Sequence, residues 1–486
     1  MHLKDSKFFK YFATYVSRDP LNDRSVNDTF ESFPTVDSAK LARFSKRPKN
    51  VKMLTSDFIE DSLYNPHYGY FNKEVEIFQT EKPFDYNNIR DNDEFINQWY
   101  KEYKKYEPPV ATEKTDSGVM DVAQKSKQQS VQLWHTPTEL FLPFYGEALA
   151  NYILMNYKLN QYPYNDLIIY EMGGGNGTLM ANILSYIRQH QPDIYARTKY
   201  KIIEISSKLA SKQMKSAISL KLAENNLDAS KVQIINKSIF EWDTKVTDPC
   251  YFIALEVFDN FSHDVVRYDN LTQQPYQGYV SVDDNGDFKE FYSPELTPYT
   301  KSFLNLRERT KFASNGDNQD LSLMERAKKV WKPQMPLDEP LYWRQMKNQW
   351  WPFRYGLSQA EYVPTRLVEF FHILKYKFPN HSLLTSDFHY LPDALPGYTA
   401  PVVQTMLGSK MVTTDTYMVY QGFFDIMFPT NFELACELYR EITGKTAALA
   451  SHRAFLEQWA DVDHTKTKKG ENPMLNFYQN ASFMYS

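Results

Sequence analysis

The chain has 486 residues, of which 42% are hydrophobic, and it contains 35 tyrosines and 33 phenylalanines. This content can build a packed core and excludes a wholly disordered chain. The formal net charge of −5 gives no general attraction to nucleic acid or anionic lipid, so we expect neither as a partner. Cys250 and Cys436 are too few for a disulfide framework or a structural zinc site, and we expect no metal. No apolar run is long enough to cross a bilayer.

Composition and periodicity divide the chain into five predicted segments. The first is polar, and it mixes basic with acidic residues, which makes an ambiguous targeting signal. In chain order we expect a loosely ordered extension (1–50) and then an N-terminal helical cap (51–160). The cap contains a predicted mobile loop (107–130), which is rich in Pro, Thr, Ser, Lys and Gln. After the cap we expect the first half of an α/β core (161–270), an insertion (271–380), and the second half of the core with C-terminal helices (381–486).

The N-terminal cap contains two predicted helices. A short helical pattern runs from Thr55 to Leu63, with Thr55 or Ser56 as its N-cap. A longer amphipathic pattern runs from Thr138 to Tyr157 and leads directly into the core.

Residues 167–178 are the most informative part of the sequence. An apolar run ends in Glu171, turns through glycines and enters a helical pattern over 179–187, which indicates a strand, a tight turn and a helix. The glycines of the turn are Gly173, Gly175 and Gly177. Glycine adopts positive φ and lets a ligand approach the backbone closely, so we expect a cofactor at this turn.

Two cofactor classes use a glycine turn of this kind. A dinucleotide fold needs G-x-G-x-x-G, whose last glycine lies inside the helix, but here Thr178 occupies that position. The spacing E-x-G-x-G-x-G from Glu171 to Gly177 is instead typical of S-adenosylmethionine-dependent methyltransferases. A nicotinamide dehydrogenase and an ordinary strand-to-helix turn remain the alternatives.

Short apolar runs alternate with helical patterns along the core, which predicts a parallel sheet. The predicted strands are 167–170, 200–205, 232–235, 251–255, 382–388 and 416–419. A long amphipathic helix from Asn431 to Thr443 is predicted to end at Gly444, a suitable residue for the position after a helix.

Acidic residues follow several of these strands, where ligands of a doubly wound sheet bind. Glu204 closes the second strand and can accept hydrogen bonds from both hydroxyls of a ribose. Glu256 and Asp259 follow the fourth strand, where a functional role and a position as solvated loop carboxylates are equally open. Asp387, at the end of the next strand, is as well explained by a structural role as by a functional one.

Three aromatic or histidine features have a plainer interpretation. Trp242 could border an adenine but is better explained as a core residue. His263 beside Asp264 suggests an acid/base pair, although a single histidine near a loop is more often incidental. A Trp-rich piece lacks the basic stripe of a single-strand binder, so a buried core or a protein-binding surface explains it better.

Six blocks of the sequence match a known family. They are Asn65-Pro66 with Gly69-Tyr70, Thr136-Pro-Thr-Glu139, the glycine turn Glu171–Met180, Glu204-Ile-Ser206, Glu256-Val-Phe-Asp259 and Gly422-Phe-Phe-Asp425. Through them the chain resembles the MidA-type methyltransferases, the family that includes the mitochondrial complex I assembly protein-arginine methyltransferase.

The resemblance implies a Rossmann-like class I methyltransferase core of α/β class, with an N-terminal helical cap and a large insertion. It implies S-adenosyl-L-methionine as cofactor and symmetric dimethylation of arginine on a mitochondrial protein, such as a respiratory-complex subunit, with a homodimer as the oligomer to test. The residues that match the family's cofactor motifs are Glu171, Gly173, Gly175, Gly177, Glu204 and Ser206. We assign the catalytic role to Glu256 and Asp259.

The chain departs from the family pattern on the substrate side. The family's Asn before the acidic loop is Leu255 here, and its "T-A-H-V-D" stretch reads Met427-Phe-Pro-Thr-Asn431. A non-catalytic assembly or scaffold protein that keeps the methyltransferase fold is therefore the alternative function.

Overall fold

The computed structural model describes residues 30–72, 75–80, 82–106, 132–205, 208–270, 272–313, 346, 357–394, 399–407 and 410–486. Ser206, the predicted mobile loop 107–130 and the tryptophans of the Trp-rich piece lie outside the described residues.

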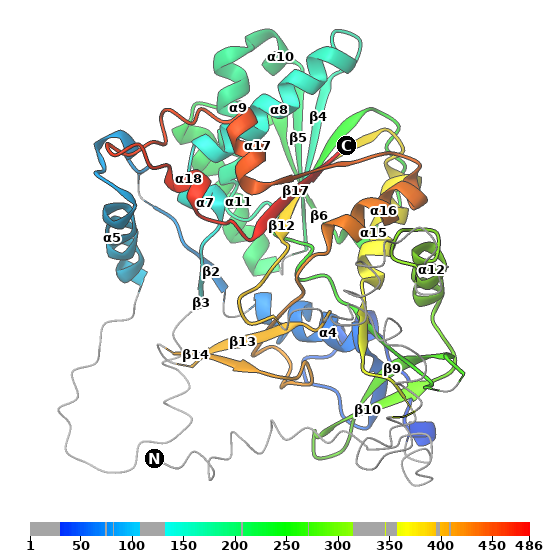
Figure 1. Ribbon diagram of the computed structural model, residues 1–486. Helices are drawn as coiled ribbons and strands as arrows, with labels where there is room; N and C mark the ends of the chain where they lie inside the picture. The colour runs from blue at the N-terminus through cyan, green and yellow to red at the C-terminus, as the bar shows by residue number, and fades with distance from the viewer. Residues whose placement is uncertain are drawn as a thin grey trace, which may run out of the picture.

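A seven-stranded sheet forms the centre of the main lobe, in the upper half of Figure 1. Its strand order is β16-β17-β12-β7-β4-β5-β6, and β12, β7, β4, β5 and β6 run parallel. The strands are β4 (Leu167–Met172), β5 (Thr198–Glu204), β6 (Val232–Asn236), β7 (Cys250–Leu255), β12 (His381–Phe388), β16 (Ala448–Ser451) and β17 (Ala481–Tyr485). This order reverses between β4 and β7, because β5 and β6 extend to one side of β4 and the later strands to the other. The five parallel strands predicted from periodicity are confirmed.

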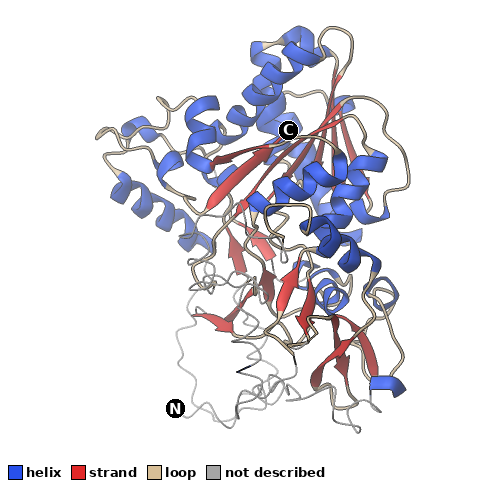
Figure 2. Cartoon of the chain, turned by 45° about the vertical axis from the view of Figure 1, so that its right-hand side comes forward, coloured by secondary structure: helices blue, strands red, loops and turns tan. Residues whose placement is uncertain are grey.

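Alternate residues of the buried strands pack against different helix layers, as the two-residue period of a strand requires. Leu167 and Ile169 face a layer of helices that contains α8 (Phe144–Asn160), α9 (Thr178–His190), α11 (Lys208–Glu224) and α17 (His452–Trp459). Ile168 and Tyr170 face the opposite layer, with α15 (Thr365–Lys377) and α16 (Phe432–Thr443). Helices therefore cover both faces of the sheet (Figure 2).

One predicted strand, Thr416–Val419, is wrong. Those residues have no regular secondary structure, although Tyr417, Met418 and Val419 are buried. The apolar run reflects burial of an irregular segment beside a small antiparallel sheet of β13 (Val402–Leu407), β14 (Lys410–Thr414) and β15 (Asp425–Met427). The main sheet is instead completed by β16 and β17, near the end of the chain.

The second lobe, lower in Figure 1, contains an antiparallel sheet. One of its strands precedes the main sheet in sequence, and the others lie between β7 and β12. They are β1 (Val51–Leu54), β8 (Asp264–Tyr268), β9 (Pro275–Val282), β10 (Phe288–Ser293) and β11 (Glu361–Val363). The segment 271–380, which we interpret as an insertion, supplies β9, β10, β11 and α12 (Pro298–Arg307). Helix α15 follows β11 but packs on the main sheet, so we place the end of the insertion before it.

The predicted helices are present in the structure, but some of their caps and bounds differ from the prediction. Helix α4 (Thr55–Tyr64) follows β1 directly, so its N-cap is Leu54 with no side-chain cap, and the predicted cap by Thr55 or Ser56 is wrong. The segment predicted as one helix over 138–157 is two, α7 (Pro137–Leu140) and α8, because Pro143 lies between them without a backbone N–H. Helix α16 is confirmed, with Asn431 as its N-cap and Gly444 at φ +77° after its last residue.

The remaining elements are short or peripheral. They are α3 (Ser38–Leu41), α5 (Asn92–Tyr103), α10 (Pro192–Ala196), α18 (Pro473–Asn476) and the parallel pair β2 (Val75–Ile77) and β3 (Gln132–Trp134). Across the residues that the structure describes, no helix combines the length and apolar character that a membrane span needs.

Candidate active site

The glycine turn connects the carboxyl end of β4 to the N-terminus of α9. Gly173, Gly175 and Gly177 have φ of +74°, +48° and +76°. A Cβ on Gly177 would lie 2.6 Å from Ile218 Cγ1, and a Cβ on Gly175 would lie 3.3 Å from Ile77 Cδ1. The turn therefore needs glycine for its left-handed backbone and for the close approach of its neighbours.

Two acids flank this turn at the ends of adjacent strands. Glu171 is buried, and its Oε2 accepts a hydrogen bond of 2.8 Å from the Tyr200 hydroxyl. Burial, with a smaller contribution from Glu204, raises the pKa of Glu171 to about 7. Glu204 is half-buried at the end of β5, where its Oε1 accepts a 3.0 Å bond from the backbone N–H of Ile205. Glu171 thus lies beneath the turn, whereas Glu204 reaches the surface beside it.

A third acid near the turn was not predicted as a site residue. Thr136 caps α7 by accepting a 3.2 Å bond from the backbone N–H of Glu139. The Glu139 side chain in turn accepts a 2.6 Å bond at Oε1 from the hydroxyl of Thr178, the first residue of α9. The T-x-x-E spacing predicts the cap of α7, whereas the bond between Glu139 and Thr178 depends on the packing of α7 against α9.

These residues fit a nucleoside cofactor. Three glycines without Cβ atoms leave the backbone of the turn accessible to a ligand, and α9 begins immediately after it. The half-buried carboxylate of Glu204, at the end of the neighbouring strand, has the chemistry to accept ribose hydroxyls. Since β4 and β7 flank the point where the strand order reverses, the turn lies where open α/β sheets bind ligands.

The predicted catalytic acids lie in the loop after β7. Glu256 has φ of +52°, an uncommon conformation for a residue with a side chain, and its N–H donates a 2.9 Å bond to the Ser386 carbonyl. Glu256 and Asp259 both border one pocket. The structure therefore brings together the two acids that the sequence predicts.

Asp387 supports this loop from β12. Its Oδ2 accepts hydrogen bonds from the backbone N–H groups of Val257, Phe258 and Asp259 at 3.0, 2.7 and 3.2 Å. Its Oδ1 accepts a further bond from Phe388 N–H at 2.7 Å. Because both oxygens of Asp387 accept backbone hydrogen bonds, this acid positions the loop.

The loop forms a cluster of buried acids with a residue that the sequence did not single out as catalytic, Asp425 on β15. Burial, and then the nearby acids, raise the pKa of Asp259 well above its ordinary value, and burial raises the pKa of Asp425 to about 7. Asp259 Oδ1 and Asp425 Oδ2 are buried and have no hydrogen-bond partner within the described part of the chain. Carboxylates buried in this way either hold a proton or bind a cationic group.

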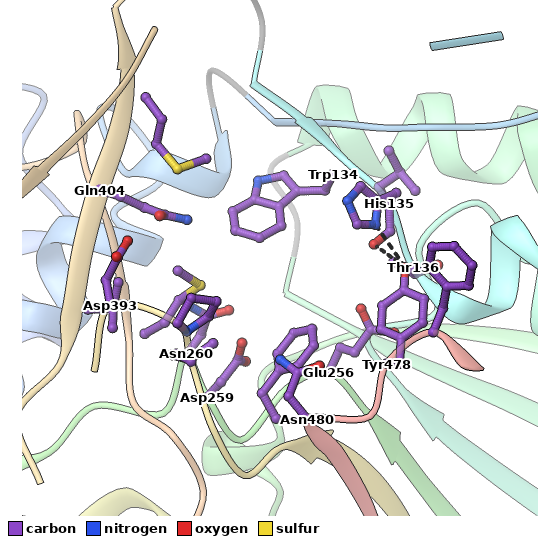
Figure 3. Close-up of a pocket in the computed structure, with 18 of the residues that line it drawn as sticks. Trp134, His135, Thr136, Glu256, Asp259, Asn260, Asp393, Gln404, Tyr478 and Asn480 are labelled. Carbon is purple, nitrogen blue, oxygen red and sulfur yellow. Dashed lines mark hydrogen bonds between the residues drawn. The ribbon is translucent and has the colours of Figure 1, made fainter. Parts of the chain in front are cut away.

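The pocket above these acids has a volume of about 940 Å³. Figure 3 shows Glu256, Asp259 and Asn260 on one side of it and Trp134 across from them. The Asn260 amide group donates a 3.0 Å bond to Asp425 Oδ1 and a 3.3 Å bond to the Ile426 carbonyl, which fixes its orientation. Over the described residues, no group of three or more His, Cys, Asp or Glu is placed to hold a metal ion.

His263 and Asp264 do not pair with each other, which favours the incidental interpretation of the histidine. The His263 ring stacks on Phe428 at 3.8 Å, and its Nδ1 lies 2.8 Å from the Phe261 carbonyl oxygen. Asp264 instead accepts a 2.8 Å bond from the Thr365 hydroxyl.

Trp242 is half-buried and packs against the core, in agreement with the expected structural role. Its ring packs against Tyr170 and Phe378, and its Nε1 donates to the Thr244 carbonyl at 2.7 Å.

An open parallel sheet, a glycine turn after its central strand and an acid at the end of the next strand together define a methyltransferase core that binds S-adenosylmethionine. A family model described as "Putative S-adenosyl-L-methionine-dependent methyltransferase" matches residues 148–451, and the chain belongs to this family. Its cofactor is S-adenosyl-L-methionine, and the enzyme class is methyltransferase.

Two fungal relatives cover most of the chain. Each is named "Protein arginine methyltransferase NDUFAF7 homolog, mitochondrial". The Schizosaccharomyces pombe protein is 24% identical over 418 residues, which are 85% of this chain and 80% of the relative. The Saccharomyces cerevisiae protein is 22% identical over 366 residues, which are 70% of this chain and 77% of the relative.

Among solved structures, the chain is similar to a protein from Burkholderia thailandensis that was crystallised with S-adenosyl-homocysteine bound. It has a TM-score of 0.49 and 12% identity, and the match covers 96% of this chain and 95% of the other.

Proposed function

We propose that the chain is a protein-arginine N-methyltransferase that acts on a mitochondrial protein. The observation that carries this proposal is the acidic floor of the pocket, where Glu256 and Asp259 lie at the end of the strand next to the glycine turn. The names of the two fungal relatives support the same substrate and the same compartment.

A guanidinium group is the cation that suits this floor. It stays protonated in proteins because its pKa is above about 12, and its planar donors match carboxylates in a bidentate geometry. Asp259 is buried and Glu256 is half-buried. Asp259 keeps an oxygen without a hydrogen-bond partner in the described structure. We assign these two acids to hold the guanidinium group and to exclude water from it. Their charges draw the positive charge of the guanidinium towards the nitrogens that they bind, and away from the nitrogen that is methylated.

The residues that would hold the cofactor are Glu171, Gly173, Gly175, Gly177, Glu204 and Ser206. When bound, S-adenosyl-L-methionine supplies a methyl group that is already activated on a sulfonium. The protein then needs only to align the nitrogen and to accept the proton that this nitrogen loses. Burial raises the pKa of the carboxyl group of Glu256 well above its ordinary value. A guanidinium bound beside it favours the ionised form, which can accept this proton.

The finer features of the proposal rest on the family resemblance. They are symmetric dimethylation of the arginine, a respiratory-complex subunit as the substrate, and a homodimer. Mass spectrometry of the modified arginine separates symmetric from asymmetric dimethylation and from monomethylation.

Transfer of a labelled methyl group to mitochondrial protein tests the proposed function. We expect the wild-type chain to label arginine, and Glu256→Ala to bind S-adenosylhomocysteine but lose about 10²-fold or more in transfer rate. Asp248→Ala is the matched control, because Asp248 is exposed just before the opposite end of the same strand.

Each contrary result has a distinct meaning. Full methylation by Glu256→Ala would reject the carboxylate clamp. A wild-type chain that binds the cofactor and transfers no methyl group to any protein would favour the scaffold alternative.

A further inference from the structure

The pocket is much larger than the acidic floor, and most of its wall is apolar. Helix α5 contributes Ile96, Trp99, Tyr100 and Tyr103, and the small three-stranded sheet contributes Val402, Met406, Met411 and Met427. A volume of about 940 Å³ is near the upper end of the usual range for ligand pockets, about 300–1,000 Å³. It has room for the neighbours of an arginine as well as for its side chain.

The apolar surface continues to the rim. Ile96, Tyr100 and Met411 line the pocket and are 43%, 53% and 56% exposed, which is unusual for large apolar side chains grouped around one opening. Methionine side chains are flexible and polarisable, so Met406, Met411 and Met427 can adapt to apolar groups of different shape. Such a rim binds apolar residues on either side of the reacting one.

The charges of the pocket have one sign. Glu256, Asp259 and Asp393 line it, and the lining residues that the structure describes include no lysine or arginine. In Figure 3, Asp393 lies near Gln404, on the side of the pocket away from Tyr478. Acidic residues in a bound segment would be repelled by these carboxylates and would have no described lysine or arginine of the lining to pair with. Glycine or serine would leave the apolar wall without contacts.

Two tryptophans of the wall offer hydrogen-bond donors. The indole Nε1 atoms of Trp99 and Trp134 are buried and have no partner within the described residues. Indole N–H groups are donors only, and a peptide in an extended conformation presents carbonyl oxygens that can accept them. Figure 3 shows the Trp134 ring across the pocket from Glu256 and Asp259, with its indole nitrogen on the side of the ring turned away from these acids.

From these features we infer that the pocket binds an extended protein segment in which the methylated arginine is flanked by large apolar residues. This inference rests on the proposed arginine methyltransferase activity and adds the class of sequence around the arginine. Segments with glycine-rich or acidic residues around the arginine are excluded as good substrates.

Three sets of short peptides, each with one central arginine, test this specificity. The first set has Leu, Val and Phe around the arginine, the second Gly and Ser, and the third Asp and Glu. With labelled cofactor, we expect kcat/KM for the apolar set to exceed that for the glycine-rich set by at least tenfold, with no measurable transfer to the acidic set. Equal rates for the apolar and glycine-rich sets would overturn the inference and leave the proposed function standing.

Failure of the proposed function has a different signature. It would be the absence of transfer to every peptide and to mitochondrial protein, by a chain that still binds S-adenosylhomocysteine. The same result would remove the inference, since the inference rests on that function.

Variants of the wall then test the assignment of the binding surface. Ile96→Ser changes an exposed side chain and should lower the preference for apolar peptides several-fold without altering the rate on the glycine-rich set. Trp134→Phe keeps an aromatic ring and removes the N–H donor, and should raise KM more than it lowers kcat. Trp459→Phe is the matched control, because its Nε1 is also buried without a partner in the described structure but does not line the pocket. An unchanged preference in Ile96→Ser and an unchanged KM in Trp134→Phe would overturn the assignment.

Discussion

At the residue scale, the acids around the site differ in the hydrogen bonds that compensate the burial of their carboxyl groups. Asp387 accepts four backbone N–H groups, and Glu171 accepts one tyrosine hydroxyl. Asp259 retains an oxygen without a partner in the described part of the molecule. Desolvation nevertheless dominates in all three, since the pKa of each is raised. Their protonation is therefore linked to the stability of the fold.

Glu171→Gln tests this linkage. A carboxyl whose pKa rises from 4.5 to about 7 on folding stabilises the native state below pH 4.5, and that stabilisation is lost as the pH rises towards 7. Glutamine resembles the neutral acid, so the variant should be more stable than the wild type by about 3 kcal/mol at pH 8 and by little at pH 4.5.

Urea unfolding at the two pH values measures the difference. Exposed Glu241, replaced by glutamine, is the control and should give no such pH-dependent gain. A stability difference for Glu171→Gln that is equal at both pH values would contradict the burial argument.

The loop after β7 depends, at the scale of elements, on an adjacent strand. Asp387 on β12 binds three consecutive N–H groups of residues 257–259, and the N–H of Glu256 donates to Ser386 on the same strand. The sequence predicted both strands, from the apolar run 251–255 before Glu256 and from Leu383-Leu384 shortly before Asp387. The sequence left the role of Asp387 open, because this role depends on β12 lying beside β7. The two strands are more than a hundred residues apart in the chain, so no local pattern shows that they are neighbours.

Asp387→Asn should disturb the loop and leave the cofactor turn intact. An amide group cannot accept hydrogen bonds on both of its ends, so at least one of the bonds to Val257, Phe258, Asp259 or Phe388 must be lost. We expect kcat for methyl transfer to fall by about 10- to 100-fold, with little change in affinity for S-adenosylhomocysteine. Stopped-flow or steady-state kinetics with calorimetry would measure the two effects. A parallel loss of cofactor affinity would show that the loop and the turn are not separable.

The comparison of other predicted helices and strands with the structure shows which of them a local sequence pattern can predict. The 3.6-residue period and the caps predicted α16 within one residue, because its ends are set locally by Asn431 and Gly444. The same kind of apolar run at 416–419 gave a false strand, because the buried side chains pack without ladder partners. The cofactor turn was predictable from glycine spacing alone, whereas the contribution of Glu139 depends on packing of α7 against α9.

At the scale of the whole molecule, segments far apart in sequence meet within the second lobe. Gln421 donates from its amide nitrogen to Asp61 Oδ2 at 3.3 Å, and Tyr68 donates its hydroxyl proton to the same carboxylate. Gly422 lies so close to Tyr68 that a Cβ there would be 1.7 Å from the Tyr68 carbonyl oxygen. Two of the blocks that carry the family resemblance therefore meet in space, which no local pattern in the sequence indicates.

Gly422→Ala should weaken this junction strongly. The backbone has φ of +81° and the methyl group would overlap a main-chain oxygen, so we expect a loss of about 3 kcal/mol or more in the free energy of unfolding. Gly470→Ala is the matched control, since Gly470 has φ of +83° and nothing within 4 Å of the added methyl group. Its loss should be only about 1–2 kcal/mol. Equal losses in chemical denaturation would contradict the close approach of the two blocks.

Titration calorimetry with S-adenosylhomocysteine tests the central claim, that the glycine turn after β4 binds the cofactor. Gly175 and Gly286 both have positive φ, but only Gly175 lies in the turn. We predict that the wild type and Gly286→Ala bind with similar affinity, that Gly175→Ala binds at least tenfold more weakly, and that a nicotinamide dinucleotide does not bind. An absence of binding by the folded wild type, or undiminished binding by Gly175→Ala, would contradict the account.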